Sequence, residues 1–122
     1  MDAKEKNGLA VKDGNRYVHI MARYFSWNPT KARTNIRKHR IDFETAALAF
    51  SDPYAVKRFD RFVEDEERLH ILGRVNEHLL LLVVYTIQED DDHEYIRIIS
   101  ARRADREDEA SYYTQNRELG NF

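Results

Sequence analysis

Residues 68–86 read RLHILGRVNEHLLLLVVYT, and this stretch decides the fold. Its first part, Arg68–Val75, alternates between two sets of side chains, which is the pattern of a strand with two different faces. Asn76-Glu77-His78 then predicts a hairpin connection. The next run, Leu79–Thr86, is apolar on both faces, so it predicts a central strand that is covered on both sides.

Shorter elements flank this hairpin on both sides. Further strands are predicted at Tyr24–Trp27, Tyr54–Phe59 and Tyr95–Ala101. Asn28-Pro29, Asp42 and Asp105 are helix-start signals, since Asn and Asp cap helices and Pro suits the first helical position. The predicted helices are 29–40, 43–50 and 105–116. The order predicts an α+β domain in which two N-terminal helices and a C-terminal helix pack on a small antiparallel sheet.

Size and composition narrow the class of protein further. The chain has 122 residues, 42% of them hydrophobic and 34% charged, which suits one globular domain. We expect residues 1–20 to be a flexible N-terminal arm or extension and residues 21–122 to be the single domain. The absence of cysteine indicates a reducing, cytoplasmic compartment. The longest apolar run is too short to cross a bilayer, so we expect no membrane association.

Charge is distributed unevenly along the chain. The net charge is −2, but residues 21–62 carry nine Lys or Arg against four Asp or Glu. Residues 63–122 carry seven Arg against fifteen Asp or Glu. Such segregation indicates a partner that carries charge of one sign, and leaves open a second partner of the opposite sign, with nucleic acid one option for the basic half.

Several motifs, in a consistent order, resemble the BrnT family of type II toxins. They are Phe25–Ala32, Asn35 and Lys38-His39; Phe43-Glu44, Ala46-Ala47, Phe50 and Asp52-Pro53; Glu66–Arg68 and Leu72-Gly73; Val83–Thr86; and Ile96–Ala104 with Tyr112 beyond. The stretch Ile96–Ala104 is the most specific of these. Two features depart from the family pattern: Arg40 stands where Gly is usual, and the last helix begins with acidic residues.

The resemblance implies a ribonuclease of RelE-like fold that needs no metal or other cofactor. It implies an RNA substrate and a BrnA-type ribbon-helix-helix antitoxin, through which operator DNA is bound indirectly. RNA supplies its own nucleophile, the 2′-hydroxyl, so the protein has to align it, move protons and stabilise the charge on phosphorus. Arginine suits the last task, because its planar fork pairs with phosphate oxygens and stays protonated.

We therefore expect Arg68, Arg97, Arg102 and Tyr112 to be catalytic, with Arg103 binding RNA. In a straight strand Arg97 shares its face with Arg103, whereas a bulge would bring Arg97 and Arg102 together. Each of these arginines could instead pair with carboxylates or cap a helix end. Tyr112 and its neighbour Tyr113 could face either the site or the core.

Trp27, Lys38 and His39 are the remaining candidates for RNA contact. Lys38 would bind phosphate and His39 would act as acid or base, but His39 also lies on the apolar stripe of its helix. Trp27 could stack on a base or belong to the core. His70 shares a strand face with Arg68, which suits either a general base or a half-buried sheet residue. No histidine pair has metal-binding spacing, so no metal site is predicted.

Two other functions remain possible interpretations of the sequence besides an active ribonuclease toxin. The acidic last helix and Arg40 favour a catalytically degenerate toxin that still binds antitoxin and represses its operon. A stand-alone RNA-binding module is the third, and mixed charge argues against it, because non-specific affinity rests on neutralising phosphates.

Overall fold

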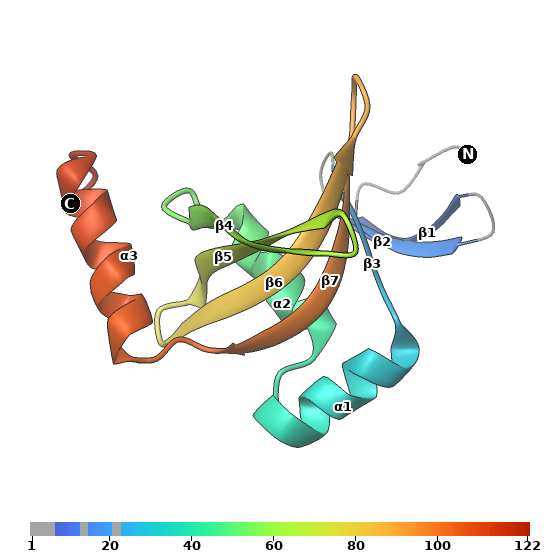
Figure 1. Ribbon diagram of the computed structural model, residues 1–122, viewed down its shortest axis with the longest axis horizontal. Coiled ribbons are helices and arrows are strands. Elements are labelled where there is room, and N and C mark those ends of the chain that lie inside the picture. Colours follow the sequence, from blue (N-terminus) through green and yellow to red (C-terminus); the bar gives the residue numbers. More distant parts are fainter. Residues whose placement is uncertain (1–6, 13–14, 21–22) are drawn as a thin grey trace.

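The computed structural model describes residues 7–12, 15–20 and 23–122. A single sheet of seven strands organises them, in the order β1-β2-β3-β7-β6-β5-β4 (Figure 1). The strands are β1 Asn7–Lys12, β2 Asn15–Ile20, β3 Arg23–Trp27, β4 Val56–Val63, β5 Glu66–Asn76, β6 Leu79–Glu89 and β7 Glu94–Arg103. The helices are α1 Pro29–His39, α2 Phe43–Ala47, the 3₁₀ turn η1 Leu48–Ser51, and α3 Arg106–Glu118.

The sheet is mixed, which corrects the expectation of a small antiparallel sheet. All neighbouring strands are antiparallel except β3 and β7, which run parallel with Phe25 opposite Ile96. The chain leaves β3 through α1 and α2 and returns through the meander β4–β7, so the last strand, β7, arrives beside β3 in the same direction. The α+β class and the central hairpin of β5 and β6 are as predicted.

The segment predicted to be a flexible arm contains strands where it is described. Residues 7–12 and 15–20 form β1 and β2, and β2 pairs with β3 at Val18↔Phe25. The rest of the segment, residues 1–6 and 13–14, lies outside the described residues, as do residues 21–22.

Side-chain capping explains where the helices begin. Asn28 accepts the backbone N–H of Thr30 and Lys31, and Asp42 accepts that of Thr45. Asp105 and Asp108 form a reciprocal capping box at the start of α3. The predicted second helix is regular only to Ala47 and then tightens into η1.

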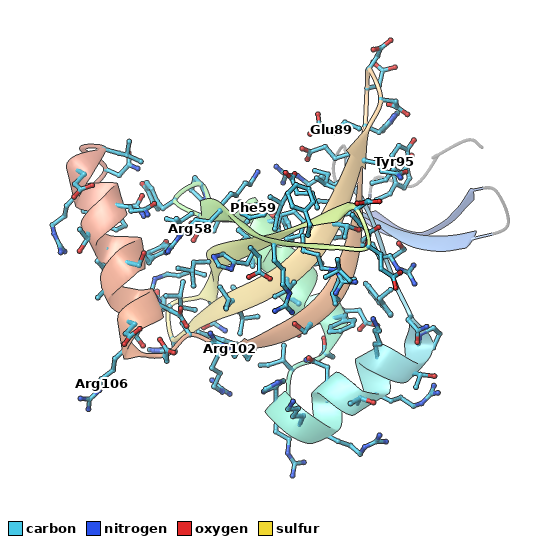
Figure 2. All side chains as sticks on the ribbon, in the orientation of Figure 1. Arg58, Phe59, Glu89, Tyr95, Arg102 and Arg106 are labelled. Atoms are coloured by element: carbon cyan, nitrogen blue, oxygen red, sulfur yellow. The ribbon has the colours of Figure 1, made fainter. Side chains whose placement is uncertain are left out.

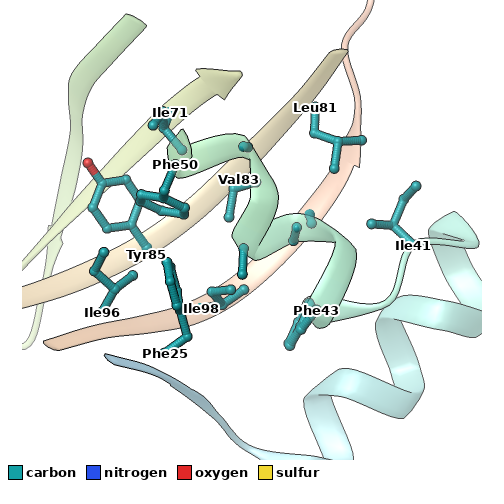
Figure 3. Close-up of a cluster of buried hydrophobic side chains, with 14 residues drawn as sticks. Phe25, Ile41, Phe43, Phe50, Ile71, Leu81, Val83, Tyr85, Ile96 and Ile98 are labelled. Carbon is teal, nitrogen blue, oxygen red and sulfur yellow. The ribbon is translucent and has the colours of Figure 1, made fainter. Parts of the chain in front are cut away.

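The main core lies between α2–η1 and one face of the sheet (Figure 3). Phe25, Phe43, Phe50, Val83 and Tyr85 are among its buried side chains. Close approach of η1 requires Gly73 on β5, because a Cβ there would lie 2.3 Å from the Ala49 carbonyl oxygen. A smaller cluster on the opposite face joins Tyr112 of α3 to Val56, Leu72 and Leu80. The helices therefore cover the two faces unequally.

Buried Asn35 attaches α1 to the sheet. Its Nδ2 donates to the carbonyl oxygens of Ala101 (2.8 Å) and Ile41 (3.0 Å), and its Oδ1 accepts the Ala101 N–H (3.1 Å). Asn35 is only 5% exposed, so its amide and the backbone groups that it bonds have little access to water. One side chain thus satisfies three backbone groups that would otherwise be buried without partners.

We predict that Asn35→Ala lowers the free energy of unfolding by about 3 kcal/mol, because three backbone groups lose their partners at roughly 1 kcal/mol or more each. Urea denaturation followed by circular dichroism measures the change. The exposed neighbour Thr34→Ala is the control and should cost less than about 0.5 kcal/mol. Equal stability of the two variants would contradict this role of Asn35.

Candidate functional site

A bulge in β7 decides which arginines lie together. Val84 of β6 pairs with Ser100 and Tyr85 pairs with Ile98, so Ile99 is an extra residue in β7. Ile98 and Ala101 both contribute to the main core, on either side of this bulge. Arg97 and Arg102 therefore share the opposite face, whereas Arg103 lies on the side of Ala101. Of the two pairings left open by the sequence, the structure has Arg97 with Arg102.

Three further basic side chains from β4 and β5 lie on the same face. Arg58 pairs across with His70, and His70 pairs with Val84. Arg68 precedes His70 by two residues on β5. Arg97 of β7 lies opposite Thr86 of β6, the strand between β5 and β7. We call Arg58, Arg68, His70, Arg97 and Arg102 the basic face. Adjacent strands are about 4.8 Å apart, so Arg58, Arg68 and His70 on β4 and β5 lie close together, while Arg97 and Arg102 lie two strands from β5.

The arginines of the basic face differ in how far their charge is already neutralised. Arg97 is exposed and makes no hydrogen bond or ion pair with any residue that the structure describes. Arg68 is 18% exposed, with Nη2 3.9 Å from Glu66 Oε1. Arg102 Nη1 donates to Asp108 Oδ2 at 2.8 Å. The ion-pair interpretation thus holds for Arg102, while Arg97 remains available to an anion.

The Arg102–Asp108 pair joins the basic face to the start of α3. Asp108 also accepts the Asp105 N–H at 2.9 Å. Burial raises the pKa of Asp108, but the hydrogen bonds from Asp105 and Arg102 outweigh it, and the pKa lies below its usual value. Figure 2 shows Arg58 and Arg102 between the sheet and α3, whereas Arg106 points away from both.

A group of buried polar atoms lies at the centre of the basic face. Arg58 Nε, Arg68 Nε and His70 Nε2 are covered from solvent, and none of the three has a hydrogen-bond partner among the described residues. Arg58 also donates through Nη2 to the Ser111 hydroxyl of α3. Each buried polar atom without a partner costs about 1–3 kcal/mol. A native chain keeps such groups where a ligand or water completes them.

Sequence reasoning missed Arg58, Asp60 and Ser111. Arg58 and Asp60 belong to β4, whose weak alternation gave no reason to choose them. Their position beside His70 depends on the register of β4 against β5, which shifts between Phe59 and Arg61. The Ser111 hydroxyl reaches Arg58 only because α3 folds back towards the sheet.

All four predicted RNA contacts lie away from the basic face. The Trp27 ring packs edge-on against Phe43 at 5.8 Å and joins the main core. Lys38 is exposed and His39 half-buried, in the last turn of α1. No hydrogen bond, ion pair or ring contact between described residues links Trp27, Lys38 or His39 to the basic face. Arg103 is exposed on the other side of β7.

Tyr112 lies in the core rather than at the site. It is 1% exposed, and its hydroxyl donates to Asp52 Oδ2 at 2.7 Å. The same carboxylate oxygen accepts the Arg74 N–H at 2.8 Å. Burial, the hydrogen bond and the charge of Asp52 all raise the pKa of Tyr112, so its hydroxyl stays protonated. This geometry assigns Tyr112 a structural role, because a bound molecule cannot reach it.

The described part of the chain has neither a metal-binding cluster nor a membrane-spanning helix. Within residues 7–12, 15–20 and 23–122, no three His, Asp or Glu side chains gather in a way that could hold a metal ion. No helix in these ranges is long and apolar enough to cross a membrane.

Tyr112→Phe should lower the free energy of unfolding by about 1.5 kcal/mol, because half-buried Asp52 loses a charge-assisted hydrogen bond from a buried hydroxyl. Thermal unfolding measures it. Tyr95→Phe is the matched control, since Tyr95 donates to Asp90 at an exposed position where water can substitute. A melting temperature for Tyr112→Phe no lower than that of the control would refute the structural assignment.

Comparison with known proteins identifies the family. Residues 27–108 match the family described as ribonuclease toxin, BrnT, of type II toxin–antitoxin systems. The chain is also similar to the crystal structure of the ribonuclease toxin BrnT of Brucella abortus, with 23% identity and a TM-score of 0.48. That similarity covers 70% of this chain and all of the other. No curated protein matches the sequence. The chain belongs to the BrnT family of ribonuclease toxins of type II toxin–antitoxin systems.

Proposed function

We propose that this chain is a cytoplasmic endoribonuclease toxin that cleaves RNA without a metal, by attack of the 2′-hydroxyl on the adjacent phosphate. The gathering of Arg58, Arg68, Arg97 and Arg102 on one face supports the proposal. Guanidinium groups can hold a phosphodiester and stabilise the negative charge of the transition state, as a metal ion would elsewhere. Arg97 is the strongest candidate, because it is exposed and unpaired among the described residues.

The proposal extends to the partners and to the organisation of the chain. A BrnA-type ribbon-helix-helix antitoxin neutralises the toxin, and operator DNA is contacted through that antitoxin. The domain has a RelE-like fold and occupies residues 21–122, with residues 1–20 as an extension. The family match covers residues 27–108, which lie within the proposed domain.

A degenerate toxin is the alternative function that one observation favours. Asp108 already neutralises Arg102 at 2.8 Å, and α3 begins with further acidic residues close by. Carboxylates at this position repel phosphate. Under this alternative the chain binds its antitoxin and represses its operon but does not cleave RNA.

Chelation tests the metal-free mechanism. We expect the rate of RNA cleavage by the purified protein to stay within about twofold in excess EDTA, because arginines supply the positive charge. Electrophoresis of a labelled RNA measures the rate, and an Arg97→Ala preparation made in parallel controls for contaminating nucleases. Loss of cleavage in EDTA and its return with magnesium would contradict the mechanism.

Substitution of the arginines separates the enzyme from the degenerate toxin. Arg97→Ala and Arg102→Ala should each slow cleavage by roughly 10- to 1,000-fold, the range for losing one transition-state contact. Arg106→Ala is the matched control, since Arg106 is exposed on α3 and has no ion pair among the described residues; it should cost less than about threefold. Circular dichroism verifies folding. A wild-type protein that binds antitoxin but cleaves no RNA would establish the alternative.

A further inference from the structure

We propose that His70 is the general base that takes the proton from the attacking 2′-hydroxyl, with Asp60 as the residue that orients its ring. This inference rests on the proposed ribonuclease activity and names the proton acceptor for it. It is drawn from the buried polar atoms of the basic face and from the charges around them.

His70 occupies the middle of the basic face. It lies on β5, directly across from Arg58 of β4, and Arg68 lies two residues before it on the same side. Its ring Nδ1 is 4.0 Å from Asp60 Oδ1, and both side chains are partly open to solvent, at 22% and 26%. A carboxylate on this side of the ring favours the tautomer with the proton on Nδ1. The lone pair is then on Nε2.

The atoms left without partners match the groups that RNA carries. Arg58 Nε and Arg68 Nε are donors that lack an acceptor, and His70 Nε2 in this tautomer is an acceptor that lacks a donor. A phosphodiester offers acceptor oxygens, and the ribose beside it offers a hydroxyl donor. One RNA linkage therefore supplies both kinds of partner. Nε2 is covered from solvent in the free protein, so the side chains around it must shift to admit the 2′-hydroxyl.

The charges around the ring keep it neutral and able to accept a proton. Burial lowers the pKa of His70 below its usual 6.5, and the charges of Arg58 on β4 and Arg102 on β7 lower it further. Asp60 on β4 and Asp108 on α3 raise it, each by more than Arg102 lowers it, but burial, Arg58 and Arg102 together outweigh them. At neutral pH the imidazole is therefore unprotonated, as a base must be.

Each bond change in the proposed step is accounted for. The 2′-O–H bond breaks and its proton passes to His70 Nε2, while the 2′-oxygen forms a bond to phosphorus. The bond from phosphorus to the 5′-oxygen breaks, and that oxygen takes a proton from the imidazolium or from water. The products are a 2′,3′-cyclic phosphate and a free 5′-hydroxyl. No oxidant, metal or other reactant is needed.

Other groups nearby fit the role less well. An arginine cannot act as base, because it stays protonated. The carboxylate of Asp108 is already occupied by Arg102 and by the Asp105 N–H. Tyr112 is buried and its hydroxyl remains protonated.

Replacement of the imidazole tests the proposal. His70→Asn should reduce kcat by roughly 100- to 10,000-fold, the usual contribution of a general base. Its Kd for a 2′-deoxy RNA analogue, which binds but cannot react, should change by less than about threefold. His78→Asn is the matched control, since His78 is exposed in the β5–β6 turn, and it should cleave at the wild-type rate. Circular dichroism and thermal unfolding establish that both variants fold.

The pH profile separates a base from a merely structural histidine. In the wild type, kcat/KM should rise with pH and level off with a midpoint below 6.5, where His70 loses its proton. His70→Asn should lose this step. Asp60→Asn should shift the midpoint to lower pH, because Asp60 raises the pKa of His70.

Two results would overturn the inference, and they are distinguishable. If His70→Asn cleaves as fast as the wild type, or keeps the same pH step, another group is the base while the ribonuclease function stands. If the folded wild-type protein cleaves no RNA at any pH, the proposed function fails and this inference fails with it. An unmoved midpoint in Asp60→Asn would remove the orienting role of Asp60.

Discussion

The hydrogen bonds between the Asn35 side chain and the backbone of Ala101 on β7 hold the domain together. β3 pairs with β7 only as far as Trp27↔Ile98, and the chain then turns into α1. Beyond that point the buried backbone of Ala101 needs a partner that no strand provides. The side-chain amide of Asn35 offers an N–H and a C=O, as a neighbouring peptide would, and bonds both groups of Ala101. This contact places α1, and through it α2 and the main core.

The bulge at Ile99 determines which arginines lie together at the site. Without it, alternation would place Arg97 and Arg102 on opposite faces of the sheet. The extra residue keeps Ile98 and Ala101 in the core and turns both arginines to the other side. The same strand thus contributes to both the core and the basic face. One inserted residue lets its apolar side chains face the core while both arginines face the other side.

Polar atoms without partners are concentrated on the basic face rather than spread through the domain. Over the described residues, Asn35 and Asn116 in the interior are hydrogen-bonded, whereas Arg58, Arg68 and His70 keep buried nitrogens unpaired. Chains usually break packing rules where a ligand must bind, and obey them elsewhere. At the acidic start of α3, Asp108 pairs with Arg102 and neutralises part of the positive charge of the basic face. This pairing explains how an acidic helix can border a basic surface.

Arg40 is explained by backbone geometry and not by chemistry at the site. It terminates α1 with a φ of 62°, in the left-handed region that glycine adopts without strain. Its N–H bonds back to the Ile36 carbonyl oxygen at 2.9 Å. The departure from the family's usual Gly therefore affects the stability of a helix end. It gives no independent support to a degenerate site.

From residue 23 onwards, local sequence determined the main elements of this protein, their order and its family, but it did not predict β1 and β2. Alternation located β5, an unbroken apolar run located β6, and Asn28, Asp42 and Asp105 marked the helix starts, because these signals act within a few residues. The tertiary structure alone decided the parallel pairing of β3 with β7, the burial of Tyr112 and the partnership of Arg97 with Arg102. It also brought Arg58 beside His70. Each of these depends on the register between strands distant in the chain, or on one inserted residue, and a shift of one residue moves every side chain to the other face.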